Sequence, residues 1–288
     1  MLVKILGSAA DGGFPQLNCN CSNCSRLRSA SLQSQPRTQT QIAFSPIEGI
    51  WFLVGASPDL RSQLLTAPEL VVSPDTSHSP LAGVFLADAL PESVIGLLHL
   101  RALQNYFVFA TPTVQRILKN ENRIFKTLEH GDAPVQWQAL AVRRRIGCHL
   151  SENPGDGPTF FYTAMPLGGD FPQYAGEEVQ RNCPQEDASV ALLVEQGNKK
   201  LFIAPHIRGR SFEWLKAAAS SDVSLLDATL PLDGPDGLLA QYPTDARGCK
   251  VLIGLSHTSA ILDEASAQHR AAREAGFEIA YDGTEIQL

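Results

Sequence analysis

The sequence predicts an α/β protein in which two packed β-sheets are flanked by helices. Short apolar strand patterns alternate with single helix patterns in both halves of the 288-residue chain, and no tandem repeat is visible. The hydrophobic fraction is 44%, which is ample for a buried core. No low-complexity linker divides the chain, so we expect one domain over residues 1–288.

In the first half of the chain, alternating or continuous apolar runs indicate strands. The expected strands are residues 2–6, 37–44, 49–55, 81–86 and 106–110, of which the second and third should pair. A glycine-rich loop, residues 7–13, follows the first strand. The first expected helix has Ser57 as N-cap and Pro58 as first helical residue, and it reaches Leu65. Two further helices are expected, one at residues 94–104 and one after a cap at residues 111–113.

The second half begins with a strand-like pattern at residues 135–146 and a loop at 151–157. Residues 189–195 and 199–204 are expected to form a hairpin across Gln196-Gly197-Asn198. The remaining expected elements are a helix at 211–219, strands at 223–227 and 251–255, a helix at 263–275 and a strand at 278–281.

The charge of the chain excludes two classes of partner. A formal charge of −7 argues against nonspecific binding to nucleic acid or to an anionic membrane, because both depend on clustered Lys and Arg. No window is apolar over the length needed to span a bilayer, and residues 1–7 read as a strand and turn, not as a signal peptide. We therefore expect a cytoplasmic protein.

Three cysteines form the densest chemical motif of the sequence, Asn18-Cys19-Asn20-Cys21-Ser22-Asn23-Cys24. Thiolates this close together select zinc or an iron–sulfur cluster, and zinc needs a fourth ligand to complete a tetrahedron. The other cysteines, Cys148, Cys183 and Cys249, are scattered, unlike a secreted disulfide framework. The alternative interpretation is three reduced thiols without a metal.

Several segments match one known family pattern. They are Leu6-Gly7-Ser8-Ala9-Ala10, Gly12-Gly13-Phe14-Pro15-Gln16, Asn18-Cys19 with Cys21 and Cys24, Arg37-Thr38-Gln39, Ala56-Ser57-Pro58-Asp59-Leu60-Arg61, Gly96-Leu97-Leu98, Leu100-Arg101 and Ile261-Leu262-Asp263-Glu264. Together they resemble the coenzyme PQQ (pyrroloquinoline quinone) synthesis protein B family. The resemblance covers nearly the whole chain and is most specific near the N-terminus.

This resemblance implies the metallo-β-lactamase fold, an αβ/βα sandwich of two mixed sheets with a metal site in a cleft at the sheet edge. In a related branch, the phosphodiesterases of phosphonate breakdown, three such cysteines and one late histidine hold a structural zinc. The corresponding segment here is Gly254-Leu255-Ser256-His257. The resemblance therefore implies that Cys19, Cys21, Cys24 and His257 hold a structural zinc, which is a closed, non-catalytic kind of site.

The same resemblance implies that the catalytic metal centre is degenerate. Where metallo-β-lactamase enzymes have His-x-His-x-Asp-His, this chain has Asp88-Ala89-Leu90-Pro91-Glu92-Ser93. Gly254 replaces a further histidine of the family, and a Gly-His segment is missing between Gly234 and Cys249. Asp227 alone matches a familiar acidic position. A catalytic metal needs about three converging protein ligands, which the family pattern does not supply here.

Two hypotheses of function follow. The first is a binding, carrier or assembly protein of PQQ biosynthesis that has a structural zinc, is not an enzyme, and takes PQQ or a PQQ precursor as ligand; a homodimer is compatible with it. The alternative is a metal-dependent hydroxylase or hydrolase whose rearranged site draws on Asp88, Glu92, His206 and Asp227, since His206 follows a strand near the sheet edge. A zinc-stabilised interaction module unrelated to PQQ is a third interpretation.

Overall fold

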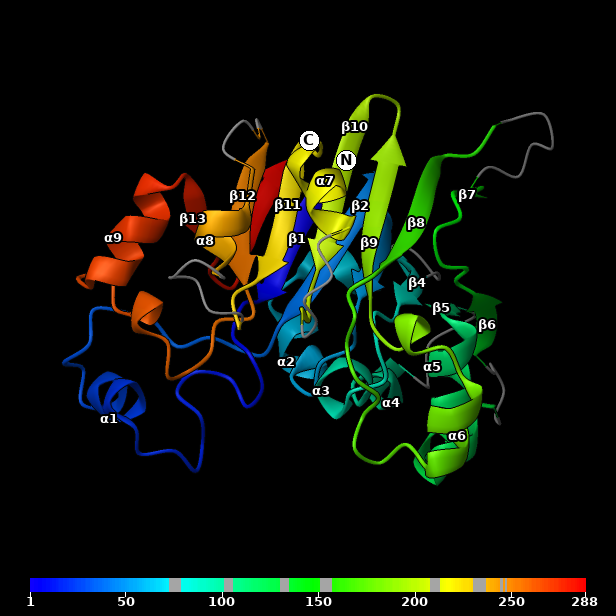
Figure 1. Cartoon of the computed structure of the whole chain (residues 1–288), viewed down its shortest axis with the longest axis horizontal. Coiled ribbons are helices and arrows are strands. Elements are labelled where there is room, and N and C mark those ends of the chain that lie inside the picture. Colours follow the sequence, from blue (N-terminus) through cyan, green and yellow to red (C-terminus); the bar gives the residue numbers. More distant parts are fainter. Residues whose placement is uncertain are drawn as a thin grey trace.

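The computed structural model of the chain describes residues 1–72, 79–100, 106–129, 135–150, 157–207, 213–229, 237–243, 246 and 248–288. Its strands form two seven-stranded sheets. The sheets pack face to face, and helices lie outside them (Figure 1). The predicted fold class of two mixed sheets flanked by helices is confirmed.

The first sheet has the strand order β14-β1-β2-β3-β4-β5-β6. Its strands are Leu2–Gly7 (β1), Gln41–Ile47 (β2), Ile50–Val54 (β3), Leu81–Phe85 (β4), Phe107–Ala110 (β5), Gln136–Ala139 (β6) and Thr284–Gln287 (β14). The second sheet has the order β13-β12-β11-β10-β9-β8-β7. Its strands are Ile146–Cys148 (β7), Phe160–Pro166 (β8), Val190–Gln196 (β9), Lys199–Ala204 (β10), Val223–Asp227 (β11), Cys249–Ile253 (β12) and Phe277–Ile279 (β13).

The two sheets share one pattern of strand directions. The pairs from β14 to β3 are antiparallel and those from β3 to β6 are parallel. Likewise, the pairs from β7 to β10 are antiparallel and those from β10 to β13 are parallel. Strands β4 and β11 therefore hold equivalent places. Asp227 is the last residue of β11, and Asp88 lies in the chain that leaves β4.

Helices form the outer layers. They are Ser22–Arg28 (α1), Leu60–Leu65 (α2), Pro91–Val94 (α3), Leu97–Leu100 (α4), Pro112–Arg116 (α5), Glu177–Asn182 (α6), Glu213–Ala219 (α7), Leu238–Gln241 (α8) and Ala267–Glu274 (α9). Short 3₁₀ helices lie at Pro68–Leu70, Arg123–Glu129, Gln185–Asp187 and Ala260–Leu262, and a π-helical turn at Ile117–Glu121. Buried residues from α2 to α6 pack on the first sheet, and those from α7 to α9 pack on the second.

Aromatic rings fill the space between the sheets. Phe44, Phe52, Phe85 and Phe109 from the first sheet meet Phe160 of the second. The rings of Phe85 and Phe109 stack with centroids 4.4 Å apart. Rings of this size each bury a large apolar area, so this layer fixes how the two sheets face each other.

Most predicted elements are present. The predicted hairpin is confirmed as β9 and β10, and the predicted pairing of the second and third strands is confirmed as β2 with β3. The predicted N-cap at Ser57 is wrong, since α2 begins at Leu60 and the Ser57 hydroxyl donates to Gln63 Oε1 at 2.8 Å. The helix predicted from residue 94 is interrupted at Gly96, whose amide donates to the carbonyl oxygen of Ala56 at 2.8 Å.

Three differences concern strands. The expected strand at 37–44 begins only at Gln41, because Arg37 and Gln39 form bridges to the loop after β1. The pattern at 135–146 divides into β6 and β7, which belong to different sheets. Strands β8 and β14 were not predicted. Residues 101–104 of the helix predicted at 94–104, most of the loop predicted at 151–157, and part of the stretch between Gly234 and Cys249 lie outside the described residues.

Candidate functional site

The cysteine-rich loop and the chain after β12 meet at one edge of the two sheets. The amide of Leu255 donates to the Ser8 carbonyl at 3.0 Å, and the amide of Ala10 donates to the Leu255 carbonyl at 3.0 Å. These bonds join the chain leaving β1 to the chain leaving β12. Figure 1 shows the loop with α1 on the same side of the molecule as α9. The two joined segments deliver the thiols and His257 to one place.

Cys19, Cys21, Cys24 and His257, the Cys3His cluster, have one ligand atom each within 4.8 Å of one another. The distances from His257 Nδ1 to the three sulfurs are 3.5, 3.5 and 3.7 Å. A tetrahedral zinc with ordinary Zn–S and Zn–N bonds would place sulfur and nitrogen about 3.6 Å apart. The donor types and their spacing therefore fit zinc.

Helix α1 and the hydrogen bonds around it position residues of the Cys3His cluster. Cys21 caps α1 and Cys24 follows in its first turn, so the two sulfurs share one face of the helix. The backbone amide of Cys24 lowers the pKa of the Cys21 thiol to about 6, and contacts with His257 and the other thiols add to this effect. Burial raises the pKa of Cys24. The Asn23 amide donates to the carbonyl oxygens of His257 and Ser259 at 3.2 and 2.9 Å, which fixes α1 to the histidine loop.

A second group of ionisable side chains, the His206 cluster, contains Asp11, Asp88, Glu92, His206 and Asp227. Nδ1 of His206 lies 2.9 Å from Asp88 Oδ2. Burial alone would lower the pKa of His206, but the charge and hydrogen bond of Asp88, together with the charges of Asp227 and Glu92, outweigh burial and raise this pKa to about 9. Burial opposes ionisation of Asp88 as well, yet His206 holds the pKa of Asp88 below its usual range. The two residues therefore form a buried ion pair.

Asp227 is buried too, but its oxygens bond to the protein backbone and a hydroxyl. Oδ2 accepts from the amide of Ile207 at 2.8 Å and from Thr229 Oγ1 at 2.6 Å, while Oδ1 accepts from the amide of Thr229 at 3.0 Å. Burial nevertheless raises the pKa of Asp227 to about 6. Its environment is that of a carboxylate that organises the loops after β10 and β11.

Asp11 is the residue that sequence reasoning missed. One ligand atom from each of Asp11, Glu92 and His206 lies within 4.8 Å of the others. Burial raises the pKa of Glu92, and the charge of Asp11 adds to this shift. The glycine-rich loop at residues 7–13 was expected only as the connection after the first strand. Its acidic residue was visible in the sequence, but its nearness to the loop after β10 was not.

Ser93 completes a Ser–His–carboxylate grouping that does not have the geometry of a catalytic triad. Ser93 Oγ lies 3.2 Å from His206 Nδ1, which is the same ring nitrogen that faces Asp88. A triad needs the serine and the carboxylate on opposite ring nitrogens. The arrangement therefore does not indicate nucleophilic catalysis by Ser93.

Gly254, which replaces a family histidine, lies against Asp227. Its φ is +62°, and a Cβ atom placed there would lie 2.4 Å from Asp227 Oδ1. An L side chain at this position would be strained and would collide with the carboxylate. The space that a histidine would need is thus taken by Asp227.

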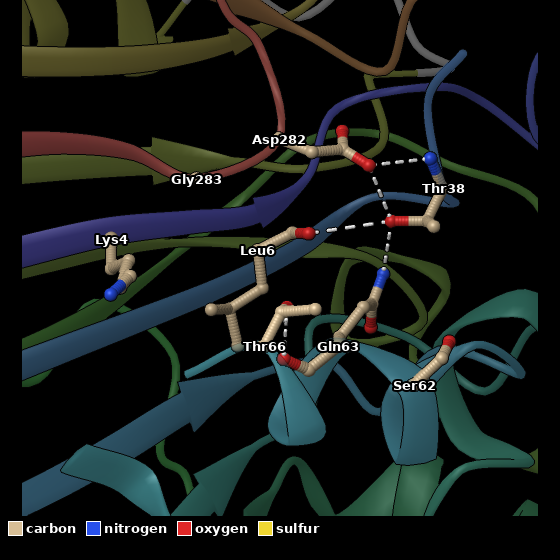
Figure 2. Close-up of a pocket in the computed structure, with 8 residues that line it drawn as sticks. All are labelled: Lys4, Leu6, Thr38, Ser62, Gln63, Thr66, Asp282 and Gly283. Atoms are coloured by element: carbon tan, nitrogen blue, oxygen red, sulfur yellow. Dashed lines mark hydrogen bonds between the residues drawn. The ribbon is translucent and has the colours of Figure 1, made fainter. Parts of the chain in front are cut away.

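Two of the cavities between described residues are compared as ligand sites. One, of about 490 Å³, is lined by Asp11, Glu92 and residues 170–174, among others. The other, of about 320 Å³, lies between β1, α2 and the chain at Asp282 (Figure 2). In Figure 2 the polar groups bond to one another, since Thr38 Oγ1 donates to Asp282 Oδ2 at 2.7 Å and accepts from Gln63 Nε2 at 2.8 Å. The first cavity is the better ligand site, because it adjoins the His206 cluster.

The fold and the edge location of both clusters define a protein of the β-lactamase superfamily. The family description "Beta-lactamase superfamily domain" matches residues 50–273. The chain is also similar to a diphosphatase of the PhnP family, with a TM-score of 0.64 and 17% identity over 100% of this chain and 97% of that chain. An identity of 17% shows only that this chain and the diphosphatase share a fold.

Similarity over the full length narrows this class. The coenzyme PQQ synthesis proteins B of Pseudomonas protegens and Klebsiella pneumoniae are 34% and 31% identical, over 100% of this chain and 100% and 98% of their own lengths. The crystal structure of Zn²⁺-bound PqqB from Methylobacterium extorquens has a TM-score of 0.85 and 28% identity over the whole of both chains. This chain belongs to the coenzyme PQQ synthesis protein B family.

Among the described residues, no helix combines the length and apolar character required to cross a membrane.

Proposed function

We propose that this chain acts in PQQ biosynthesis as a binding, carrier or assembly protein, with one structural zinc and without the catalytic metal centre of its superfamily. The full-length similarity to PQQ synthesis proteins B supports the link to this pathway. The observation that carries the non-enzymatic role is how the carboxylates of Asp88 and Asp227 are bonded. Asp88 is paired with His206, and Asp227 is bonded to Ile207 and Thr229, so neither is held ready for a metal.

The structural zinc belongs to the same proposal. Its four ligands would be Cys19, Cys21, Cys24 and His257, which leaves no open coordination position for a substrate. The zinc of the PqqB structure from Methylobacterium extorquens supports the choice of metal. All six cysteines of the chain are free thiols, which favours a reducing, cytoplasmic location.

The cavity beside residues 170–174 is the proposed place for PQQ or a PQQ precursor. Its volume of about 490 Å³ lies within the range of small-molecule sites, and Phe171 and Tyr174 offer aromatic surface to a flat heterocycle.

Binding and turnover must be measured separately to test this function. PQQ is titrated into the zinc-loaded protein while tryptophan fluorescence is followed, and the bound compound is then recovered and identified by mass spectrometry. We expect saturable binding of one PQQ per chain and recovery of unchanged PQQ. Absence of binding, together with failure to restore PQQ production in a bacterium lacking its own protein B, would contradict the proposal.

The second candidate function is a metal-dependent hydroxylase or hydrolase. The grouping of His206 with Glu92 and Asp11 favours it, because imidazole and carboxylates are suitable ligands for a catalytic metal. It requires conversion of a PQQ precursor to a product, whereas the carrier does not. Incubation of the precursor with metal-supplemented protein and analysis of products distinguishes the two candidates.

A further inference from the structure

We propose that the pocket between α2, the 3₁₀ helix at Pro68–Leu70, the start of β4 and α4 binds a small aliphatic carboxylate such as a medium-chain fatty acid. This pocket, the α2–α4 pocket, has a volume of about 380 Å³ and shares no described lining residue with the Cys3His cluster or the His206 cluster. Leu81 is the first residue of β4, whereas Asp88 follows that strand, so the pocket lies toward the opposite end of β4 from the His206 cluster. The inference concerns ligand binding alone and does not depend on a role in PQQ biosynthesis.

The α2–α4 pocket is a place where exposed aliphatic side chains gather. Its described lining includes seven leucines and valines, which are Leu64, Leu65, Leu70, Val71, Val72, Leu81 and Leu100. Leu65, Val71 and Val72 are among the eight large apolar side chains that are exposed over the described part of the chain. Leu70 and Leu81 are each only 3% exposed, so they form its deepest part. An aliphatic pocket of this volume is typical of a site for an apolar small molecule.

Two nitrogen-bearing side chains give the α2–α4 pocket its polar character. Arg61 of α2 and His99 of α4 line it, and no carboxylate does so among the described residues. No ion pair engages either side chain within the part of the chain that the structure describes. Arg61, Leu64 and Leu65 have i, i+3 and i+4 spacing, so one face of α2 presents a cation beside aliphatic surface. A guanidinium in this position is a site for an anion, and arginine binds carboxylates through two parallel hydrogen bonds.

The lining of the α2–α4 pocket favours one kind of anion over others. None of its described residues is aromatic, so a flat heterocycle such as PQQ would find no ring to stack on, whereas leucines and valines fit a flexible alkyl chain. Inorganic phosphate would use the guanidinium of Arg61 but leave the aliphatic surface in water. A carboxylate with an alkyl chain uses both parts of the pocket, and this is the class of ligand that we assign to it.

The experiment uses the full-length, zinc-loaded protein and the saturated fatty acids from hexanoate to decanoate, each below its critical micelle concentration. Isothermal titration calorimetry measures the Kd and the number of sites. We expect one site per chain, and the Kd should fall about fourfold for each added CH₂, because each CH₂ leaves water for the aliphatic surface. Decylammonium has an alkyl chain of similar length but the opposite charge, and it should bind at least about tenfold more weakly than decanoate.

Two variants test the two parts of the pocket, each with a matched control. Arg61→Gln removes the charge and should raise the Kd for decanoate by about tenfold, whereas Arg144→Gln should not, since Arg144 is also exposed but does not line the pocket. Leu65→Asn removes apolar surface and should raise the Kd about fivefold. Its control is Ile124→Asn, because Ile124 is 58% exposed outside the pocket. All four side chains are exposed, so these variants should fold, which circular dichroism verifies.

The proposal is overturned if decanoate shows no saturable binding, if the Kd does not depend on chain length, or if a control variant weakens binding as much as its partner does. A short peptide that ends in leucine also carries a carboxylate beside an aliphatic side chain. If this peptide binds more tightly than decanoate, the pocket belongs to the C-terminus of a protein partner, and the assignment to a small molecule is wrong.

Discussion

The Cys3His cluster and the His206 cluster both lie where the chain leaves strands of the sandwich, but their charges are balanced in different ways. In the first, three sulfurs surround His257 Nδ1 at 3.5 to 3.7 Å, with the spacing of a zinc tetrahedron. In the second, a buried histidine already neutralises Asp88 at 2.9 Å. The donors of the first cluster thus fit a metal ion, whereas Asp88 and His206 in the second balance each other's charge.

Within the His206 cluster, the carboxylates of Asp88 and Asp227 also differ from each other. Asp88 follows β4, Asp227 ends the corresponding strand β11 of the other sheet, and both side chains are buried. His206 holds the pKa of Asp88 down, while burial raises the pKa of Asp227 to about 6. Carboxylates near the ends of two corresponding strands therefore have opposite pKa shifts. The partner that each acquired, and not its place in the fold, determines the shift.

The largest expected effect is the loss of the zinc. Cys24→Ser removes the fully buried sulfur of the Cys3His cluster, so zinc should be lost. The free energy of unfolding should fall by about 4 kcal/mol or more, since structural zinc binding contributes directly to folding. Zinc content by atomic absorption and urea unfolding measure both effects. Cys183→Ser is the control, because Cys183 is half-buried outside the cluster, and it should keep the zinc. Retention of zinc by Cys24→Ser would contradict the assignment.

Breaking the ion pair should come next in size. Asp88→Asn leaves His206 buried without its counter-charge, which should cost about 3 kcal/mol of unfolding free energy. Asp227→Asn is the comparison at the end of the corresponding strand β11, and it should cost less, because Asp227 is bonded mainly to neutral donors. Both variants should retain zinc. Equal losses in urea unfolding would show that the pairing with His206 does not distinguish the two carboxylates.

A smaller effect is expected at Gly254. Gly254→Ala introduces a Cβ at φ +62°, against Asp227 Oδ1, and should cost about 2 kcal/mol. Gly49→Ala is the control, since Gly49 has φ +81° and nothing within 4 Å of the added atom. It should cost about 1 kcal/mol from the backbone alone. The difference between the two variants in thermal unfolding measures the contact with Asp227. No difference would mean that Asp227 moves freely aside.

The fold was largely predictable from the sequence, because continuous apolar runs such as β3 and β11 indicate strands buried on both faces. The Cys3His grouping was also predicted, and the structure brings its members together, although the metal itself stays a prediction. Asp88 and His206 were grouped only as ligands of a rearranged metal site, and their ion pair was not predicted. Distances between loops that follow different strands depend on how the sheets face each other, which no local pattern encodes.

The position of Asp11 could not be predicted from a local sequence pattern either. In the sequence it is one acidic residue in a glycine loop, where turn residues need no further explanation. It reaches the His206 cluster because the loop after β1 is fixed to the chain after β12 by the bonds between Ala10 and Leu255 and between Leu255 and Ser8. Strand β8 was missed for a different reason. Its buried and half-buried positions alternate, but Pro166 and a Met within the run weakened the pattern.

The smallest expected effect concerns the attachment of α1 to the histidine loop. Asn23 donates to the carbonyl oxygens of His257 and Ser259 without taking part in the cluster itself. Asn23→Ala should leave the four ligands in place but lower the zinc affinity about tenfold, as loss of supporting hydrogen bonds does at other metal sites. Competition with a zinc chelator measures the affinity. The exposed Asn20, between two of the cysteines, supplies the control Asn20→Ala, for which no change is expected. An equal decrease in both variants would show that the loop as a whole, and not the two bonds of Asn23, positions His257 for the metal.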